Sequence, residues 1–333
     1  MKLRVGVIGQ GPQWQTRYSP ALRVLTDRYD VRAVFGIVAK LAENIAAEFQ
    51  ADVVDGYQEL VQRNDIDAVL ILERTWLGWL PMLAACEAGK AVYWAGDLCV
   101  DCQSDNDLRS RIDESGISLM AEFPRRFAPA TLRLKELIAT QLGQPELIFA
   151  HRRLTAESGA RSMHREMMEL VDWCRYVVGR SPDRVLSLCH PPFDSQNPDS
   201  VDASLYRRIT LFFDATENDS PVTAQISCGR YIPEKWNEAF GHQSPSDMQV
   251  RCERGIAFVD LPTNAVWFDD GGRNVERLES ETPVGQQLLS NFHRAATSLL
   301  RNLSGLDDVF AAAMILEAAN LSESVGGWAK VST

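Results

Sequence analysis

This sequence has little positive charge relative to its negative charge, and it lacks long apolar runs and an export signal. The 333 residues carry 34 Lys and Arg against 45 Asp and Glu, a formal net charge of -11. Nucleic acids and anionic membranes select basic surfaces, so this balance argues against either as the main partner. No stretch reaches the roughly 18 apolar residues that span a bilayer, and the apolar run after Met1 is too short for a signal peptide. We therefore expect a cytoplasmic protein.

The seven cysteines are an odd number in a long chain without a secretion signal. This usage favours reduced thiols over a disulfide framework. Cys99 and Cys102 have the spacing of a redox dithiol or of half a zinc site, but no second pair at ligand spacing accompanies them. We expect no metal site, and the sequence assigns these two thiols no role.

The length fits two domains, because 333 residues exceed what one typical core organises. Apolar strand-like runs alternate with helical patterns through about the first 120 residues, which predicts a doubly wound parallel sheet of the Rossmann type. The expected strands are 3–8, 30–37, 53–54, 68–72, 91–94 and 117–121, with helices from the first turn to Arg28 and at 40–49, 57–63, 76–88 and 105–115.

The pattern changes near Arg126, where strand-like runs begin to follow one another without intervening helices. Such runs predict an α+β domain with a largely antiparallel sheet. We place the domains at 1–123 and 124–333, with the last helices as candidates for packing back on the first domain. The expected helices are 130–141, 163–178, 285–301 and 307–325, and the expected strands 146–153, 184–190, 205–214, 221–230, 248–253 and 256–260.

Six motifs in a fixed order give the chain a family resemblance. They are Arg4 to Gly11 (RVGVIGQG), Ala42 to Phe49, Asp65 to Val69 (DIDAV), Ala84 to Val92 (AACEAGKAV), Arg126 to Pro129 (RFAP) and Ala311 to Gly327. In this the chain resembles the glucose-fructose oxidoreductase / inositol dehydrogenase / MocA family, written Gfo/Idh/MocA. The resemblance implies a Rossmann domain for NAD or NADP and a second domain whose open antiparallel sheet shapes the substrate pocket. It also implies a homodimer or homotetramer.

The glycine turn after the first strand is the first candidate cofactor site. It reads Gly9-Gln10-Gly11-Pro12-Gln13-Trp14, where a G-x-G-x-x-G turn lets the backbone approach a pyrophosphate. Two of the three glycines of this motif remain. Trp14 stands at the third position, where a glycine allows the helix to pack closely. Pro12 suits a first helical turn but removes one potential phosphate donor. We take Gly9, Gly11, Pro12, Gln13 and Trp14 as cofactor-binding candidates.

Two more strand ends depart from what the resemblance implies. The acid that accepts hydrogen bonds from the adenosine ribose aligns with Gly36, and Lys40 is the nearest base for a 2′-phosphate, unless it only solvates the start of a helix. Where a Thr-Pro turn and a His are expected, Arg74 and Gly78 stand. Arg74 has the chemistry to hold an anionic group, and equally to pair with a neighbouring carboxylate.

The catalytic positions differ most. The family carries Glu-Lys-Pro after the fifth strand, with the lysine orienting substrate and cofactor, whereas this chain has Ala95-Gly96-Asp97. A later helix of the family bears a His with a polar group three residues before it, and Glu169 and Asp172 align there. A carboxylate can serve as a general base, although an ion-paired helix face is the simpler interpretation. The catalytic candidates are therefore Glu169, Asp172 and Asp97.

Three functions fit these observations. The first is an NAD(P)-dependent oxidoreductase of a sugar, polyol or related small molecule, with a degenerate active site. The second is a non-catalytic relative that binds a nucleotide, a sugar or a protein partner, and the third is an enzyme of another class that reuses the cleft. The departures fall on functional positions while the framework motifs survive, so we expect a maintained fold whose usual chemistry is lost or rebuilt.

Overall fold

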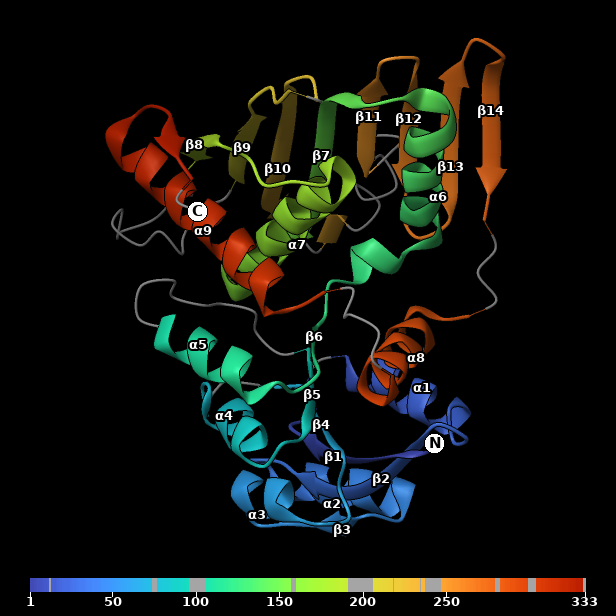
Figure 1. Ribbon diagram of the computed structural model, residues 1–333, viewed down its shortest axis with the longest axis vertical. Helices are drawn as coiled ribbons and strands as arrows, with labels where there is room; N and C mark the ends of the chain where they lie inside the picture. The colour runs from blue at the N-terminus through green and yellow to red at the C-terminus, as the bar shows by residue number, and fades with distance from the viewer. Residues whose placement is uncertain are drawn as a thin grey trace. The chain divides into compact units, whose positions relative to one another are not determined.

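A computed structural model of the chain describes residues 1–11, 13–73, 77–95, 106–156, 160–190, 206–217, 219–233, 235–236, 247–278, 282–298 and 304–331. They form two compact units, which Figure 1 shows. The N-terminal unit comprises Met1–Pro124 and Glu281–Val309, and the C-terminal unit comprises Arg125–Ser280 and Phe310–Thr333.

The N-terminal unit is built on a six-stranded sheet in which every strand pair is parallel. Along the sheet the strands are β3 (Asp52–Val53), β2 (Tyr29–Phe35), β1 (Leu3–Ile8), β4 (Ala68–Ile71), β5 (Ala91–Trp94) and β6 (Leu119–Ala121). The strand order reverses between β1 and β4, which is where doubly wound sheets bind ligands beyond the carboxyl ends of their strands. The predicted fold class is confirmed.

The helices of this unit are α1 (Ser19–Val24), α2 (Ala39–Phe49), α3 (Tyr57–Gln62), α4 (Leu80–Glu87), α5 (Asn106–Ser115) and α8 (Val284–Thr297). Helix α1 differs from the prediction, which was a single helix that reaches Arg28. A π-helical turn, η1 (Trp14–Tyr18), comes first, and α1 restarts with Pro20 in its first turn and ends at Val24. Proline lacks the N–H that a continuing helix would need, so the ladder of hydrogen bonds breaks there.

The C-terminal unit contains a nine-stranded mixed sheet. Only β7 and β10 pair in parallel among its described strands, so the prediction of a largely antiparallel sheet is confirmed. The sequence did not predict the strands β13, β14 and β15. In spatial order the strands are β14 (Gly272–Arg277), β13 (Asn264–Asp269), β12 (Gly255–Asp260), β11 (Met248–Cys252), β7 (Pro145–Thr155), β10 (Val222–Ile232), β9 (Tyr206–Phe213), β8 (Arg184–His190) and β15 (Ala329–Lys330).

One face of this sheet packs against helices, and the described helices leave the other face open. The helices α6 (Pro129–Leu137), α7 (Ala160–Val178) and α9 (Leu306–Val325) lie across the same face in Figure 1, and the short turns η2 (Pro124–Phe127) and η3 (Ile138–Leu142) flank α6. Side chains on the covered face, such as Ile148 and Ile226, are fully buried. On the other face, Phe149 stays 38% exposed and Phe268 41% exposed.

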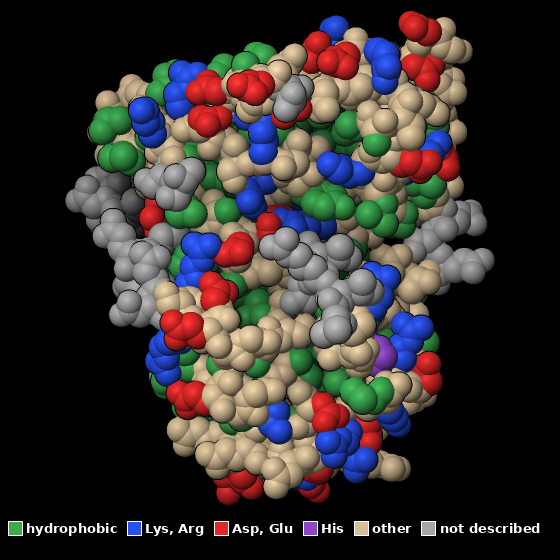
Figure 2. Space-filling view, in the orientation of Figure 1, with side chains coloured by type: hydrophobic (Ala, Val, Ile, Leu, Met, Phe, Trp, Pro, Cys, Tyr) green, Lys and Arg blue, Asp and Glu red, His purple; other side chains and the backbone are tan. Residues whose placement is uncertain are grey.

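Charged side chains of both signs intermingle on the surface that Figure 2 shows, over both units. Within the described residues, no helix is long and apolar enough to cross a membrane.

Candidate functional site

The turn after β1 is fixed by two glycines. Gly9 and Gly11 have φ angles of 76° and 61°, a region that only glycine enters readily. A side chain at either position would also collide with the chain after β4. A Cβ on Gly11 would lie 2.6 Å from the carbonyl oxygen of Leu72, and one on Gly9 would lie 2.5 Å from the Cβ of Glu73. The turn therefore packs against the end of β4 as well as exposing its backbone.

Gln13 and Trp14 serve the structure of this turn. The carbonyl of Gln13 accepts the N–H of Arg17 at 2.8 Å, which begins the π-helical turn, and the N–H of Trp14 donates to the carbonyl of Gly11 at 3.4 Å. The indole of Trp14 is 1% exposed and meets the ring of Phe49 edge-on, with the ring centroids 6.0 Å apart. Trp14 thus fills the core between the turn and α2.

A cavity of about 150 Å³ lies beside the glycine turn. Ligand pockets usually measure roughly 300–1,000 Å³, so this one has room for a part of a dinucleotide, such as one ring or one ribose. Its walls are mostly apolar. They comprise Gly9 and Gln10 of the turn, residues 34–38 at the end of β2, Leu41, Ala42 and Ile45 of α2, and Glu73 after β4.

Gly36 and Lys40, the two candidates from the end of β2, take different places. Gly36 lines the cavity, and a Cβ added there would meet the Cβ of Ala42 at 3.4 Å, an ordinary contact. The Lys40 side chain is 76% exposed, and its ammonium pairs with Glu43 at 3.1 Å. Lys40 is not among the residues that line the cavity. Among the described residues, Glu73 is the one charged side chain that does.

Several predicted residues lie outside the described part of the chain. They are Pro12, Arg74, Gly96, Asp97, Cys99 and Cys102. Their assigned roles stay predictions from the sequence. Among the described residues, no group of three or more His, Cys, Asp or Glu side chains is arranged to hold a metal ion.

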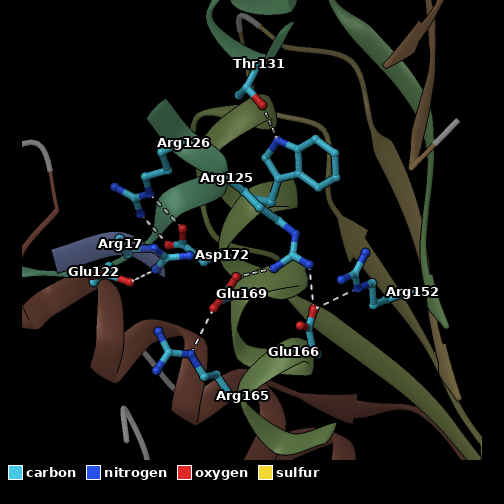
Figure 3. A network of polar contacts seen from close by, with 11 residues as sticks. Arg17, Glu122, Arg125, Arg126, Thr131, Arg152, Arg165, Glu166, Glu169 and Asp172 are labelled. Carbon is cyan, nitrogen blue, oxygen red and sulfur yellow. Dashed lines mark hydrogen bonds and ion pairs between the residues drawn. The ribbon is translucent and has the colours of Figure 1, made fainter. Parts of the chain in front are cut away.

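Glu169 on α7 is held by arginines in the C-terminal unit. Its carboxylate accepts hydrogen bonds from Arg125 and, at 3.1 Å, from Arg165 one turn earlier on the same helix. The Glu169 side chain is 9% exposed. Figure 3 shows both arginines directed at this carboxylate. Such charge-assisted hydrogen bonds fix the position of the carboxylate.

Asp172, one turn further along α7, is buried in a two-point ion pair. The Nε of Arg126 donates to Oδ2 of Asp172 at 2.7 Å, and its Nη2 donates to Oδ1. The exposed fractions are 7% for Arg126 and 1% for Asp172. Arg126 also lies over the ring of Tyr176, 5.2 Å from its centroid. A planar guanidinium that matches both carboxylate oxygens in this way fixes the position of each partner.

Glu166 extends the same network toward the sheet. It bonds to Arg125 at 2.5 Å and pairs with Arg152 of β7 at 3.5 Å, as Figure 3 shows. Burial alone would raise the pKa of Glu166. The positive charges of Arg125, Arg152 and Arg165, with the hydrogen bond from Arg125, outweigh burial and hold that pKa below its usual value.

A second buried carboxylate cluster occurs in the N-terminal unit, at the carboxyl end of β6. Glu122 is fully buried, and it accepts hydrogen bonds from Arg17, from the hydroxyl of Tyr93 and, at 2.7 Å, from the hydroxyl of Tyr18. Burial, followed by the charge of Glu122, raises the pKa of Tyr93 well above its ordinary value. The cluster ties the π-helical turn to β5 and β6.

Sequence reasoning missed Glu73, Glu122 and the partners of the α7 carboxylates. A signal for Glu73 existed, since it directly follows a buried strand whose carboxyl end belongs to the ligand edge of the sheet. For Arg125 and Arg126, an arginine pair before the Phe127-Ala128-Pro129 motif was visible, but nothing in the sequence joins it to acids more than 40 residues later.

Comparisons with known proteins place this geometry in context. Residues 3–94 match the Gfo/Idh/MocA oxidoreductase family, whose description is an NAD-binding Rossmann fold. An NADP⁺-linked scyllo-inositol 2-dehydrogenase of Bacillus subtilis is 26% identical over 41% of this chain and 37% of its own length. An inositol 2-dehydrogenase of Saccharopolyspora erythraea is 31% identical over 45% of this chain and 44% of its own. The chain thus spans less than half the length of these curated relatives.

Solved structures extend the similarity to the whole fold. An oxidoreductase from Thermotoga maritima superposes with a TM-score of 0.81 at 15% identity, covering 99% of each chain. An aldose-aldose oxidoreductase from Caulobacter crescentus gives a TM-score of 0.80 at 14% identity, covering 99% of this chain and all of the other. At such identities the likeness establishes the fold.

Proposed function

Because residues 3–94 match the Gfo/Idh/MocA oxidoreductase family, we propose that the chain is an NAD(P)-dependent oxidoreductase of a sugar, polyol or related small molecule. In its degenerate active site Gly96 replaces the usual lysine, and the Glu169–Asp172 pair replaces the usual polar group and histidine. The observation that carries the proposal is the cavity beside the Gly9–Gly11 turn, at the carboxyl ends of β1, β2 and β4. This is where a doubly wound sheet holds a dinucleotide.

The described residues fit part of such a cofactor. Gly9 and Gln10 of the turn line the cavity, and the apolar end of β2 with the first turns of α2 offers one ring a place. Pro12 and Arg74 complete the predicted cofactor site by sequence. A bound nicotinamide cofactor would supply hydride chemistry, and the protein's part would be to hold and orient it.

The open face of the C-terminal sheet supports the proposal of a homodimer or homotetramer. Phe149 and Phe268 remain exposed there, together with Val275, which is 59% exposed. The strand register from β7 through β11 and β12 to β13 and β14 places these three side chains on the same side of the sheet. Large exposed apolar faces of this kind usually mark a protein interface.

A second candidate function is a non-catalytic relative that keeps the fold. The observation that favours it is the state of the two predicted catalytic carboxylates. Glu169 and Asp172 are both engaged by arginines, so each would have to leave an ion pair to meet a substrate.

Titration with NADH and NADPH, followed by nicotinamide fluorescence, tests the first candidate. We expect saturable binding of at least one nucleotide, and loss of binding in Gly11→Ala. The matched control is Gly116→Ala, because Gly116 has a similar φ of 64° but no neighbour that a Cβ would meet. If the wild-type protein binds neither nucleotide at saturating concentration, the oxidoreductase proposal is wrong. Binding without turnover of any polyol or sugar would support the non-catalytic relative.

A further inference from the structure

The π-helical turn η1 follows the glycine turn, at the place where the helix of a nucleotide-binding unit begins. π-helical turns are rare and often occur at functional sites. The carbonyl of Gln13 accepts the N–H of Arg17 at 2.8 Å and that of Tyr18 at 3.4 Å. The N–H of Trp14 donates to the carbonyl of Gly11 at 3.4 Å, so the glycine turn and η1 form one hydrogen-bonded segment.

Two contacts in the core hold η1, one at each end. The buried indole of its first residue, Trp14, packs edge-on against Phe49 of α2. Its last two residues, Arg17 and Tyr18, both donate hydrogen bonds to the carboxylate of Glu122, and the hydroxyl of Tyr18 does so at 2.7 Å. Figure 3 shows the Arg17 guanidinium directed at this fully buried carboxylate. Glu122 thus joins η1 to the end of β6.

Such an anchor matters in this chain because Trp14 stands where a third glycine usually lets the helix pack closely on the strand. Without that close packing, the position of η1 depends on its contacts in the core. Charge-assisted hydrogen bonds to a carboxylate are among the stronger contacts that a protein can make. We propose that Glu122 is a positioning residue for the cofactor, because it holds η1 and thereby the Gly9–Gly11 turn that receives the pyrophosphate. This inference rests on the proposed function, since it requires that the turn binds a dinucleotide.

Small movements of the turn affect binding because backbone N–H groups hold an anion only over a narrow range of distances, about 2.7–3.2 Å from nitrogen to oxygen. Gly9 and Gln10 also line the cavity, so a shift of the turn changes the shape of the site. The N–H of Gly9 donates to the carbonyl of Phe35 at 2.9 Å, which fixes the start of the turn. Its end is fixed through η1, and therefore through Glu122.

Tyr18→Phe tests the inference, because it removes one hydrogen bond between η1 and Glu122. For the nucleotide that the full-length protein binds more tightly, NADH or NADPH, we expect the dissociation constant to rise about tenfold, the factor that one hydrogen bond to a charged group can contribute. Without nucleotide, hydrogen–deuterium exchange of the segment 9–18 should be faster than in the wild type. Tyr29→Phe is the matched control. Tyr29 is 3% exposed in the same unit, donates its hydroxyl to the carbonyl of Leu289 at 2.6 Å and does not line the cavity.

Both substitutions remove one buried hydrogen bond, so both should lower the Tm by a similar amount. Weaker nucleotide binding and faster exchange of the segment 9–18 should appear in Tyr18→Phe alone, which a merely structural role of Glu122 would not produce. Glu122→Gln, where circular dichroism shows that it folds, should weaken binding at least as much as Tyr18→Phe. The inference is wrong if Tyr18→Phe leaves binding or exchange unchanged, or if Tyr29→Phe weakens binding equally. Those outcomes leave the proposed function intact, whereas a wild type that binds neither nucleotide overturns both proposals.

Discussion

Asp172→Asn separates a structural from a catalytic role for the buried pair on α7. The substitution keeps the size of the side chain and removes its charge, which takes the Asp172 charge away from the Arg126 side chain, itself 7% exposed. Breaking a buried ion pair from one side typically lowers the free energy of unfolding by about 3–5 kcal/mol. For a unit of this size, that predicts a fall in Tm of about 6–20 °C.

Thermal and urea unfolding followed by circular dichroism measure this effect. Asp214→Asn is the matched control, since Asp214 pairs with Arg184 in the same unit but its side chain is 52% exposed. Exposed pairs contribute only about 0–1 kcal/mol. The double variant Arg126→Met/Asp172→Leu should recover part of the lost stability, because it removes both charges of this pair while Arg175, which lies 3.7 Å from Asp172, keeps its own. If Asp172→Asn is as mild as the control, the structural interpretation of this pair is wrong.

Two further predictions concern the C-terminal unit. Burial, aided by the charges of Arg152 and Arg153 and opposed by Asp247, lowers the pKa of His151. The unfolded chain then takes up a proton at about pH 6.5 that the folded chain does not take up. The free energy of unfolding should therefore fall as the pH drops from 7 to 5. Urea titrations should show that His151→Gln flattens this slope. Phe149→Glu, on the open sheet face, should convert the proposed oligomer to monomers, which light scattering would detect as a lower mass. A monomeric wild type would contradict the proposed interface.

The sequence predicted the strands of the N-terminal sheet well because their signals are local. β1 and β5 have the predicted bounds, Leu3–Ile8 and Ala91–Trp94, since β1 is a mostly apolar run that ends at the Gly9 turn and β5 is apolar throughout. The hairpin of β13 and β14 was missed. β14 has few apolar side chains, and its largest, Val275, is 59% exposed, so it lacks the alternation that marks a half-buried strand.

The candidate site was harder to predict because its meaning depends on which strands become neighbours. Glu73 lines the cavity beside the glycine turn only because β1, β2 and β4 lie side by side and the middle strand is followed by Gly9. Periodicity placed Glu169 and Asp172 near one another on a helix. It did not show that Arg125 and Arg126 come from another element to meet them.

These pairings narrow the choice between the two candidate functions. Of the three predicted catalytic acids, Glu169 and Asp172 are both engaged in ion pairs with arginines, so each would have to leave its partner to meet a substrate. Asp97 is the third, and it directly follows Gly96, which we predict to stand at the position of the lysine in the family that the chain resembles. If the protein is an oxidoreductase, we therefore expect Asp97 to carry the proton transfer. Asp97 is thus the residue on which the oxidoreductase proposal and the non-catalytic alternative differ most.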